Sequence, residues 1–104
     1  MPKTAAIEEA LTAAPNNYKL LFENDRVRML DLSIDPGDRT VMHSLRDHLV
    51  YIVTDCTATF ISPGGQPEQC TLNRGQATWF PARSHEIANN GTKPMEAIIV
   101  EFKS

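Results

Sequence analysis

Residues 37–53, GDRTVMHSLRDHLVYIV, alternate apolar and polar side chains on either side of a short charged break. Successive side chains of a β-strand point to opposite faces, so the alternation predicts one strand from Val41 onward and another over residues 48–53. The side chains expected on the inner faces of these two strands are Val41, His43, Leu45, His48, Val50 and Ile52. Two histidines are therefore expected on an otherwise aliphatic interior.

The same pattern continues along the chain on both sides of this segment, with glycine, proline, asparagine and aspartate at regular intervals. Further strands are predicted over residues 18–22, 27–34, 58–61, 69–72, 78–80, 86–88 and 95–102. In the penultimate of these, His85, Ile87 and Asn89 share one face. Eight or nine short strands at this spacing predict an all-β fold, either a sandwich or a closed barrel.

The N-terminal segment, residues 1–16, has a helical rather than an alternating pattern. Its apolar residues recur at helical spacing, Thr4 is a candidate N-cap with Glu8 close behind, and Pro15 ends the run. We expect one short helix that covers an open end of the barrel. A chain of 104 residues is too short for separate cofactor and substrate domains, so we predict a single domain over residues 1–104 with its barrel at 18–102.

Composition excludes several classes of function. The chain is 41% hydrophobic and 22% charged, with a net charge of −3, and it has no basic stretch suited to nucleic acid or to an anionic membrane. No apolar run approaches the length of a membrane span, and Glu8 and Glu9 interrupt the region a secretory signal would need. We therefore expect a cytoplasmic location, in which Cys56 and Cys70 are free thiols.

Glycine, proline and histidine residues recur at defined spacings in two parts of the chain. His43 follows Gly37 by six residues, and Tyr51 comes shortly after; later, Pro81 follows Gly75 by six residues and Asn89 follows His85 by four. This arrangement resembles the two motifs of the cupin superfamily over residues 18–102. The resemblance implies a double-stranded β-helix, or jelly-roll barrel, of the RmlC-like type, with the short N-terminal helix outside it.

The sequence departs from the family pattern at several positions. Leu45 stands where the family has its second histidine, and His48 falls one or two residues before the expected glutamate. Asp55 replaces the closing glycine of the first motif. In the second motif Arg83 replaces a glycine, and His85 comes one residue early. The fold implied by the resemblance tolerates these changes, whereas the family's four-ligand metal set is incomplete.

The three histidines suggest a metal site with fewer ligands than the family's. The resemblance implies that His43, His48 and His85 hold one divalent transition metal (Fe, Ni, Mn, Cu or Zn) inside the barrel, with positions open for a substrate. A metal-free barrel is the alternative, because Leu45 replaces a family ligand.

A small organic ligand or substrate is expected beside this site. Arg83 and Arg46 are candidates to bind a carboxylate, and Leu45, Ile52 and Ile87 would form apolar wall. No catalytic residue is assigned, because the sequence analysis identifies no inward-facing carboxylate.

Three functions remain open. The first is a metal-dependent oxygenase or isomerase acting on a small molecule; the second is a non-catalytic cupin that binds or senses a small ligand; the third is a structural dimer module. We also expect a homodimer, because an apolar outer row of Met42, Tyr51 and Val53 and exposed edge strands favour self-association.

Overall fold

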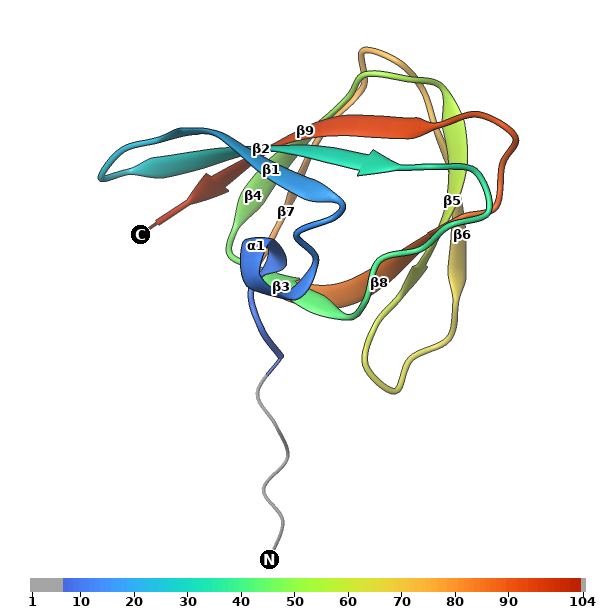
Figure 1. The fold of residues 1–104 in the computed structure, drawn as a ribbon, viewed down its shortest axis with the longest axis horizontal. Coiled ribbons are helices and arrows are strands. Elements are labelled where there is room, and N and C mark those ends of the chain that lie inside the picture. The colour runs from blue at the N-terminus through green and yellow to red at the C-terminus, as the bar shows by residue number, and fades with distance from the viewer. Residues whose placement is uncertain (1–6, 104) are drawn as a thin grey trace, which may run out of the picture.

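The computed structural model describes residues 7–103 and consists almost entirely of β-strands (Figure 1). One helix, α1 (Ala10–Ala13), precedes the strands. The strands are β1 (Tyr18–Glu23), β2 (Val27–Ile34), β3 (His43–Leu45), β4 (His48–Ile52), β5 (Cys56–Ile61), β6 (Glu68–Leu72), β7 (Ala77–Phe80), β8 (Arg83–Asn89) and β9 (Met95–Phe102). Every strand predicted from the alternation is present. No helix in the described part of the chain is long and apolar enough to span a membrane.

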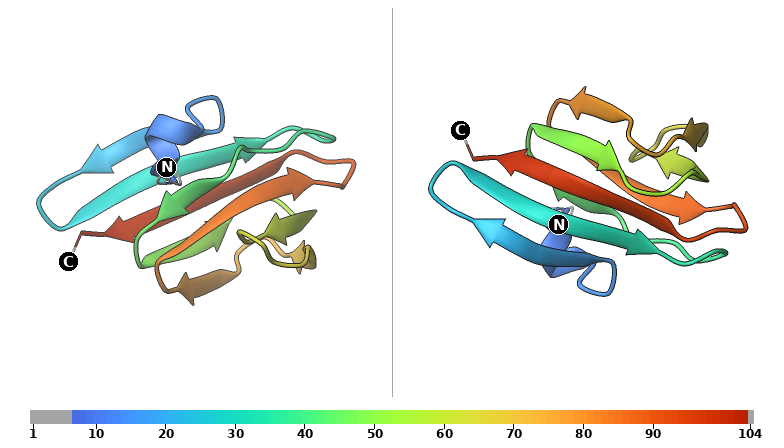
Figure 2. Two further views of the ribbon diagram at one scale, coloured as in Figure 1. Left: turned by 90° about the horizontal axis from the view of Figure 1, so that it is seen from below. Right: turned by 90° about the horizontal axis from the view of Figure 1, so that it is seen from above.

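The strands form two antiparallel sheets that face each other. One sheet has five strands in the order β1-β2-β9-β4-β7, and the other has four in the order β3-β8-β5-β6 (Figures 1 and 2). Neighbours in space are therefore often far apart in sequence: β2 pairs with β9 over eight residues, from Val27 opposite Phe102 to Ile34 opposite Met95. This register matters because a shift of one residue would turn every buried side chain outward.

The core lies between the sheets and follows the period of two. Along β9, Met95, Ala97, Ile99 and Glu101 are buried while the residues between them are only partly buried. Along β8, His85, Ile87 and Asn89 are buried in the same alternating way. The predicted inner faces of β4 and β8 are thus confirmed.

One part of the predicted inner face is wrong. Strand β3 begins at His43 rather than at Val41, and Val41 is 57% exposed. The residues before His43 belong to the preceding loop, so the alternation of the strand does not extend to them. Instead, buried Thr40 turns inward and its hydroxyl accepts a hydrogen bond from the backbone N–H of Ile87.

The backbone conformation explains why glycine occupies positions 37 and 75. Gly37 and Gly75 have φ angles of 82° and 87°, which lie in the left-handed region that side chains other than glycine rarely adopt. Each glycine is in a turn, before β3 and before β7 respectively. The chain can therefore return sharply into the next strand, which brings the two motifs to the same barrel.

The helix α1 closes the barrel between β1 and β3, the edge strands of the two sheets on that side (Figure 1). Ala10, in the helix, and Ala14, its C-cap, are both buried. The cap is Glu9, whose carboxylate accepts hydrogen bonds from the backbone N–H groups of Leu11 and Thr12. The predicted cap Thr4 lies outside the described residues, and the described helix is a single turn, shorter than the predicted segment.

Candidate ligand-binding cavity

A cavity of about 110 Å³ lies between the two sheets. Its walls come mainly from aliphatic and aromatic side chains of both sheets. Among them are Leu45, Val50, Ile52, Phe60, Leu72, Phe80, Ile87 and Ile99. The exposed residues of the lining are Glu68, Gln76 and Thr78. These belong to the edge strand β6 or lie in or just before the edge strand β7, so the cavity opens between β6 and β7, on the side of the barrel away from α1.

Sheet pairing brings two of the three predicted histidines together. His43 on β3 lies directly opposite His85 on β8, and their ring centroids are 4.9 Å apart with the rings edge to face. His48, on the other sheet, lines the cavity together with His85, whereas His43 is not part of its lining. All three side chains are buried.

His43 has both ring nitrogens engaged. Its Nδ1 lies 2.8 Å from the backbone carbonyl of Val41, and its Nε2 lies 2.8 Å from the hydroxyl of Tyr18. A carbonyl oxygen only accepts, so Nδ1 carries the hydrogen and Nε2 accepts from the tyrosine. Burial raises the pKa of Tyr18, and the nearby charge of Glu101 adds to this effect, so the hydroxyl stays a neutral donor.

His48 is held by its backbone neighbour and by an aromatic ring. Its Nδ1 donates to the carbonyl of Arg46 at 2.6 Å, and the imidazole stacks on Phe80 at 5.6 Å between centroids. The tautomer fixed by the carbonyl makes Nε2 the acceptor nitrogen. Burial lowers the pKa of His48, although the Arg46 carbonyl opposes this shift. The ring is therefore neutral at physiological pH.

His85 differs from the other two histidines. It is only 4% exposed, and neither ring nitrogen has a hydrogen-bond partner among the described residues. Burial lowers its pKa to about 3, and repulsion from His43, Arg83 and His48 contributes to the shift. Buried polar groups are almost always hydrogen-bonded, so the partners of His85 must come from whatever fills the cavity, whether water or a ligand.

Arg83 places a positive charge at the same cavity. Its guanidinium carbon lies 5.4 Å from the ring centroid of Phe80 and 6.0 Å from that of Phe60. These are cation–π distances, which hold the head group over the two rings. Within residues 7–103, no acidic side chain forms an ion pair with Arg83.

The other residues predicted to contact a ligand divide into two groups. Leu45, Ile52 and Ile87 line the cavity. Arg46 does not: it is exposed, and its Nη1 donates to the carbonyl of Lys103 at 3.1 Å. It borders a separate polar cleft of about 390 Å³, and Leu45 is the one residue that lines both spaces.

The residues do not fit the predicted three-histidine metal centre in this arrangement. No group of three histidine, cysteine, aspartate or glutamate side chains in residues 7–103 is placed to hold a metal ion. The reason is chemical as well as geometric: His43 Nε2 accepts a hydrogen from Tyr18, and its Nδ1 carries a hydrogen of its own. Metal ligation needs an imidazole nitrogen with a free lone pair.

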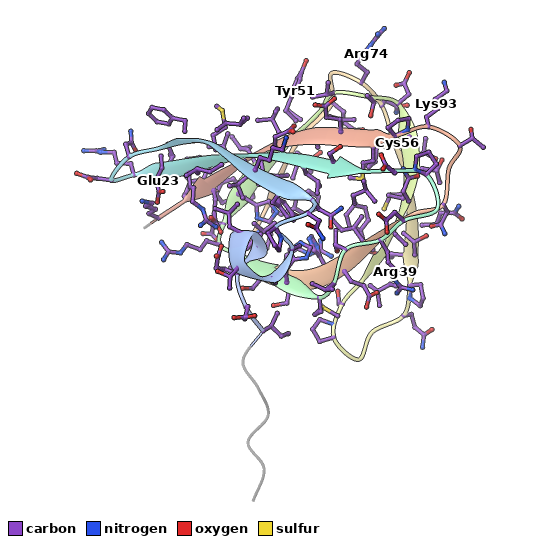
Figure 3. All side chains as sticks on the ribbon, in the orientation of Figure 1. Glu23, Arg39, Tyr51, Cys56, Arg74 and Lys93 are labelled. Carbon is purple, nitrogen blue, oxygen red and sulfur yellow. The ribbon has the colours of Figure 1, made fainter. Side chains whose placement is uncertain are left out.

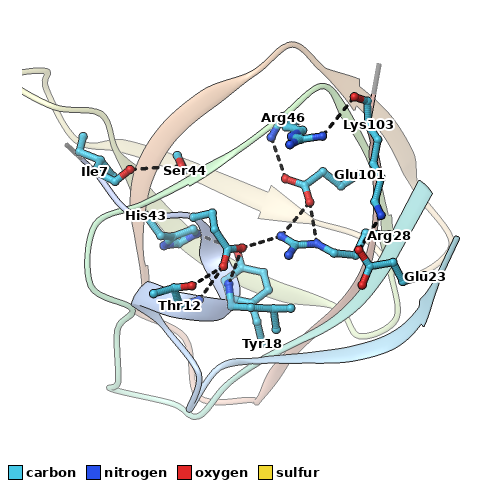
Figure 4. A network of polar contacts seen from close by, with 12 residues as sticks. Ile7, Thr12, Tyr18, Glu23, Arg28, His43, Ser44, Arg46, Glu101 and Lys103 are labelled. Carbon is cyan, nitrogen blue, oxygen red and sulfur yellow. Dashed lines mark hydrogen bonds and ion pairs between the residues drawn. The ribbon is translucent and has the colours of Figure 1, made fainter. Parts of the chain in front are cut away.

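One inward-facing carboxylate was not predicted from the sequence. Glu101 is 4% exposed, and its carboxylate accepts from Arg28 at 2.9 Å and from the backbone N–H of Arg46 at 2.9 Å (Figure 4). Arg28 also pairs with Glu9 at 2.6 Å and so connects α1 to the barrel. The signal was present, because Glu101 continues the alternation of Met95, Ala97 and Ile99. Its partners occupy it, so it adds no free base to the cavity.

Tyr18 and the two phenylalanines beside Arg83 were likewise not predicted as site residues. Tyr18 is 2% exposed at the start of β1, and nothing local in the sequence connects it with His43, which lies 25 residues later. Phe60 on β5 and Phe80 on β7 carry no polar group that would mark them as site residues. Their role depends on the packing of β5 and β7 around Arg83, which becomes visible only when the sheets are assembled.

The chain is similar to known proteins in its structure. The sequence matches no protein-family model and no curated protein. A cupin domain from Bordetella pertussis Tohama I is similar over 97% of this chain and 100% of its own, with a TM-score of 0.79 and 20% identity. An RmlC-like cupin with a double-stranded β-helix fold, from Methanocaldococcus jannaschii, covers 82% of this chain (77% of its own) with a TM-score of 0.64 and 15% identity.

A third similar structure is a polyketide cyclase from Streptomyces resistomycificus. It covers 100% of this chain and 81% of its own, with a TM-score of 0.65 and 17% identity. At these identities the likeness concerns the fold alone. The fold is a small double-stranded β-helix with one short helix, as the sequence motifs predicted.

Proposed function

Starting from a chain with the cupin fold, we propose that this barrel binds a small organic acid in its internal cavity without needing a metal ion. The expected ligand has an apolar body, one carboxylate and at least one hydroxyl or similar hydrogen-bonding group. This is the ligand-binding, metal-free alternative that the replacement at Leu45 left open. Three features of the cavity support it.

The unpartnered imidazole of His85 carries the proposal. A neutral imidazole has one donor and one acceptor nitrogen, and in His85 both are buried without a partner in residues 7–103. Leaving a buried polar group unsatisfied costs about 1–3 kcal/mol. A ligand hydroxyl beside His85 would recover this free energy on binding. His48, whose Nε2 is an acceptor, offers a second position for a donating group.

Arg83 supports the acidic group of the ligand. Guanidinium groups bind carboxylates through two parallel hydrogen bonds, which adds geometric specificity. Phe60 and Phe80 hold this head group at the cavity, and no acidic side chain of the described chain pairs with it. A ligand carboxylate would supply the missing counter-charge.

The size of the cavity limits the ligand. An apolar protein cavity of about 150 Å³ accepts benzene. The cavity here is smaller, at about 110 Å³, but it opens between β6 and β7, so a six-membered ring with short substituents would have to extend partly into this opening. The aliphatic walls favour burial of such a ring, since each buried apolar Å² contributes roughly 25 cal/mol.

A metal-dependent oxygenase or isomerase is the competing function. It would require His43, His48 and His85 to share one ion, and the hydrogen bonds of His43 to Tyr18 and Val41 oppose that arrangement. The polyketide cyclase among the similar structures is an enzyme, but at 17% identity it supports no residue-level transfer of activity. We therefore treat ligand binding as the function of this site.

A matched pair of ligands tests the proposal. We expect 4-hydroxybenzoate to raise the melting temperature of the wild-type protein more than 4-hydroxybenzyl alcohol does, in the presence of a metal chelator. In Arg83→Leu the ratio of the affinity for the acid to the affinity for the alcohol should fall about tenfold. This corresponds to a loss of roughly 1.4 kcal/mol of binding free energy. His85→Leu should weaken both ligands, because both carry the hydroxyl.

The control variant is Arg74→Leu, since Arg74 is an exposed arginine that points away from the barrel and does not line the cavity (Figure 3). It should bind as the wild type does. An affinity that depends on added metal, or an equal effect of Arg83→Leu and Arg74→Leu on the acid, would show that the proposal is wrong.

A further inference from the structure

Leu45 separates the internal cavity from the neighbouring polar cleft. Among the residues that the structure describes, it is the one that lines both the cavity of about 110 Å³ and the cleft of about 390 Å³. Its side chain is buried, at 4% exposure, and belongs to the hydrophobic core. Leu45 therefore forms the wall between the two spaces.

The cleft beyond Leu45 differs in character from the cavity. Its walls carry three acidic and three basic side chains, those of Glu9, Glu23, Glu101, Arg28, Arg46 and Lys103. Of these, Glu101 is buried, and its carboxylate is held between Arg28 and the backbone N–H of Arg46, the residue after Leu45 (Figure 4). A ligand that passed Leu45 would therefore leave an apolar space and meet charged groups.

The head group of Arg83 leans toward the opening of the cavity. Arg83 on β8 is the register partner of Leu45 on β3. Its guanidinium nevertheless lies over Phe60 and Phe80, on β5 and β7, and β5 is on the opposite side of β8 from β3. Since the cavity opens between β6 and β7, a ligand carboxylate bound by Arg83 would lie on the side of the opening. The body of the ligand would then point inward.

His85 and Leu45 lie at the inner end of a ligand held in this way. His85 follows Arg83 by two residues on the same face of β8, which places their Cα atoms roughly 6.6 Å apart. On β3, His43 is opposite His85, and Leu45 shares the inner face with His43. A group that extends past the imidazole of His85 on this side would meet the aliphatic side chain of Leu45. A polar group pressed against it would lose water without gaining a hydrogen bond, which is unfavourable.

We propose that Leu45 limits the length of the acids that the cavity accepts, because it closes the inner end of the cavity toward the polar cleft. This inference rests on the proposed function and narrows its ligand class to short monocarboxylic acids with a hydroxyl attached directly to the apolar body. Acids with a longer inner substituent are excluded by the leucine side chain. Zwitterions and dicarboxylic acids are excluded as well, because their second charge would be buried against Leu45 without a partner.

A pair of acids that differ by one methylene at the inner end tests the proposal. Titration calorimetry in the presence of a metal chelator would compare 4-hydroxybenzoate with 4-(hydroxymethyl)benzoate. The wild-type protein should bind the shorter acid about tenfold more tightly, the discrimination that an apolar wall achieves for one methylene. In Leu45→Ala this preference should disappear, because the longer group can enter the cleft. Leu45→Val removes less of the buried side chain and so disturbs folding less, and it should give an intermediate ratio.

A third acid tests whether the space beyond Leu45 is the polar cleft. The acid 4-(aminomethyl)benzoate carries an ammonium group at its inner end. Leu45→Ala should bind it about tenfold more tightly than the wild type does, since the ammonium can then approach the carboxylate of Glu101. The double variant L45A/E101Q should lose this gain. A gain that persists in the double variant would show that the opened space does not lead to Glu101 and would overturn the proposal.

Val50→Ala is the matched control, because Val50 also lines the cavity with an aliphatic side chain but does not border the cleft. It should keep the wild-type preference for 4-hydroxybenzoate over 4-(hydroxymethyl)benzoate. An equal change of this preference in Leu45→Ala and Val50→Ala, or no change in either, would overturn the proposal.

The corresponding amides separate the length limit from the proposed function. The compounds 4-hydroxybenzamide and 4-(hydroxymethyl)benzamide have similar shapes to the two acids but no negative charge. If the amides bind as tightly as the acids, the acid-binding function is wrong. The ratio between the two amides still measures the length limit, and a ratio that Leu45→Ala leaves unchanged overturns it. If neither acids nor amides bind to any variant, both proposals are wrong.

Discussion

The hydroxyl of Tyr18 donates a hydrogen bond to Nε2 of His43 across 2.8 Å, in the buried interior of the barrel. Strand β1 thereby blocks the nitrogen that a metal ion would need, while the Val41 carbonyl holds the other nitrogen of the ring. In this structure both ring nitrogens of His43 are therefore engaged by protein groups. Of the residues predicted for the site, His48, His85 and Arg83 bring polar groups to the cavity lining.

Removing this hydroxyl should destabilise the protein. Tyr18→Phe leaves the buried acceptor of His43 without a donor, so the free energy of unfolding should fall by about 1–2 kcal/mol in urea denaturation. Tyr51→Phe is the control, since Tyr51 is half exposed and its hydroxyl has no protein partner within the described residues. Equal stability of Tyr18→Phe and the wild type would contradict the hydrogen bond.

The buried imidazole of His85 should make stability depend on pH. Its pKa is about 3 in the folded protein against 6.5 for an ordinary histidine, so the unfolded chain binds the proton more readily. Stability is therefore complete at neutral pH and should fall as the pH drops from about 6.5 toward 3, by up to about 1.4 kcal/mol per pH unit.

Unfolding measured between neutral and mildly acidic pH checks this prediction. His85→Leu should reduce the slope, and the pKa values of His43 and His48, which burial also lowers, should account for part of what remains. A variant that keeps the full wild-type slope would show that His85 is not the main titrating group.

Leu45 offers a way to test the metal preference of the barrel. It lies on the same strand face as His43 and lines the cavity with His48 and His85, so Leu45→His would add a third imidazole there. We expect zinc to raise the melting temperature of this variant, because three imidazoles form a common zinc ligand set. The wild-type protein should show little response.

The double variant L45H/H85A should lose the zinc response, which serves as its control. Metal analysis of untagged wild-type protein provides the complementary measurement. Stoichiometric metal in the wild type, lost in His43→Ala, would restore the three-histidine centre and refute the metal-free function.

The anchoring of α1 depends on Glu9. Hydrogen bonds from Thr12, Arg28 and the Leu11 N–H outweigh partial burial and lower the pKa of this carboxyl to about 2, so it is ionised at neutral pH. Glu9→Ala removes both the helix cap and the ion pair to Arg28, and should lower the free energy of unfolding by about 1–2 kcal/mol.

Glu8→Ala is the matched control for Glu9→Ala. Glu8 contributes its backbone carbonyl to the N–H of Ser44, and alanine keeps that bond. Comparable losses of stability in the two variants would mean that the charge of Glu9 is unimportant for closing the barrel.

The bounds of the strands and of the helix differ in how well the sequence predicts them. The alternation of Met95, Ala97 and Ile99 is local, and it predicted β9 with its actual bounds. The start of β3 was misplaced at Val41, since the alternation of apolar residues runs two residues past the point where backbone pairing ends. Helix α1 was predicted too long for a similar reason, because helical spacing does not show how many turns the packing supports.

The residues that line the cavity were predicted better than the contacts they make. The inward faces of β4 and β8 correctly placed His48, Ile52, His85 and Ile87 on the interior. Arg46 does not line this cavity, because the direction of an exposed loop side chain depends on partners such as Lys103, which is 57 residues away.

The order of side chains along this chain is enough to predict eight or nine short strands and two tight glycine turns, since both depend on neighbouring residues. Which imidazole nitrogens are free is a different kind of property. It depends on Tyr18 meeting His43 and on β3 pairing with β8, contacts between segments far apart in sequence. Hydrogen bonds act over about 3 Å, so only the assembled sheets could reveal that His43 is occupied while His85 is not.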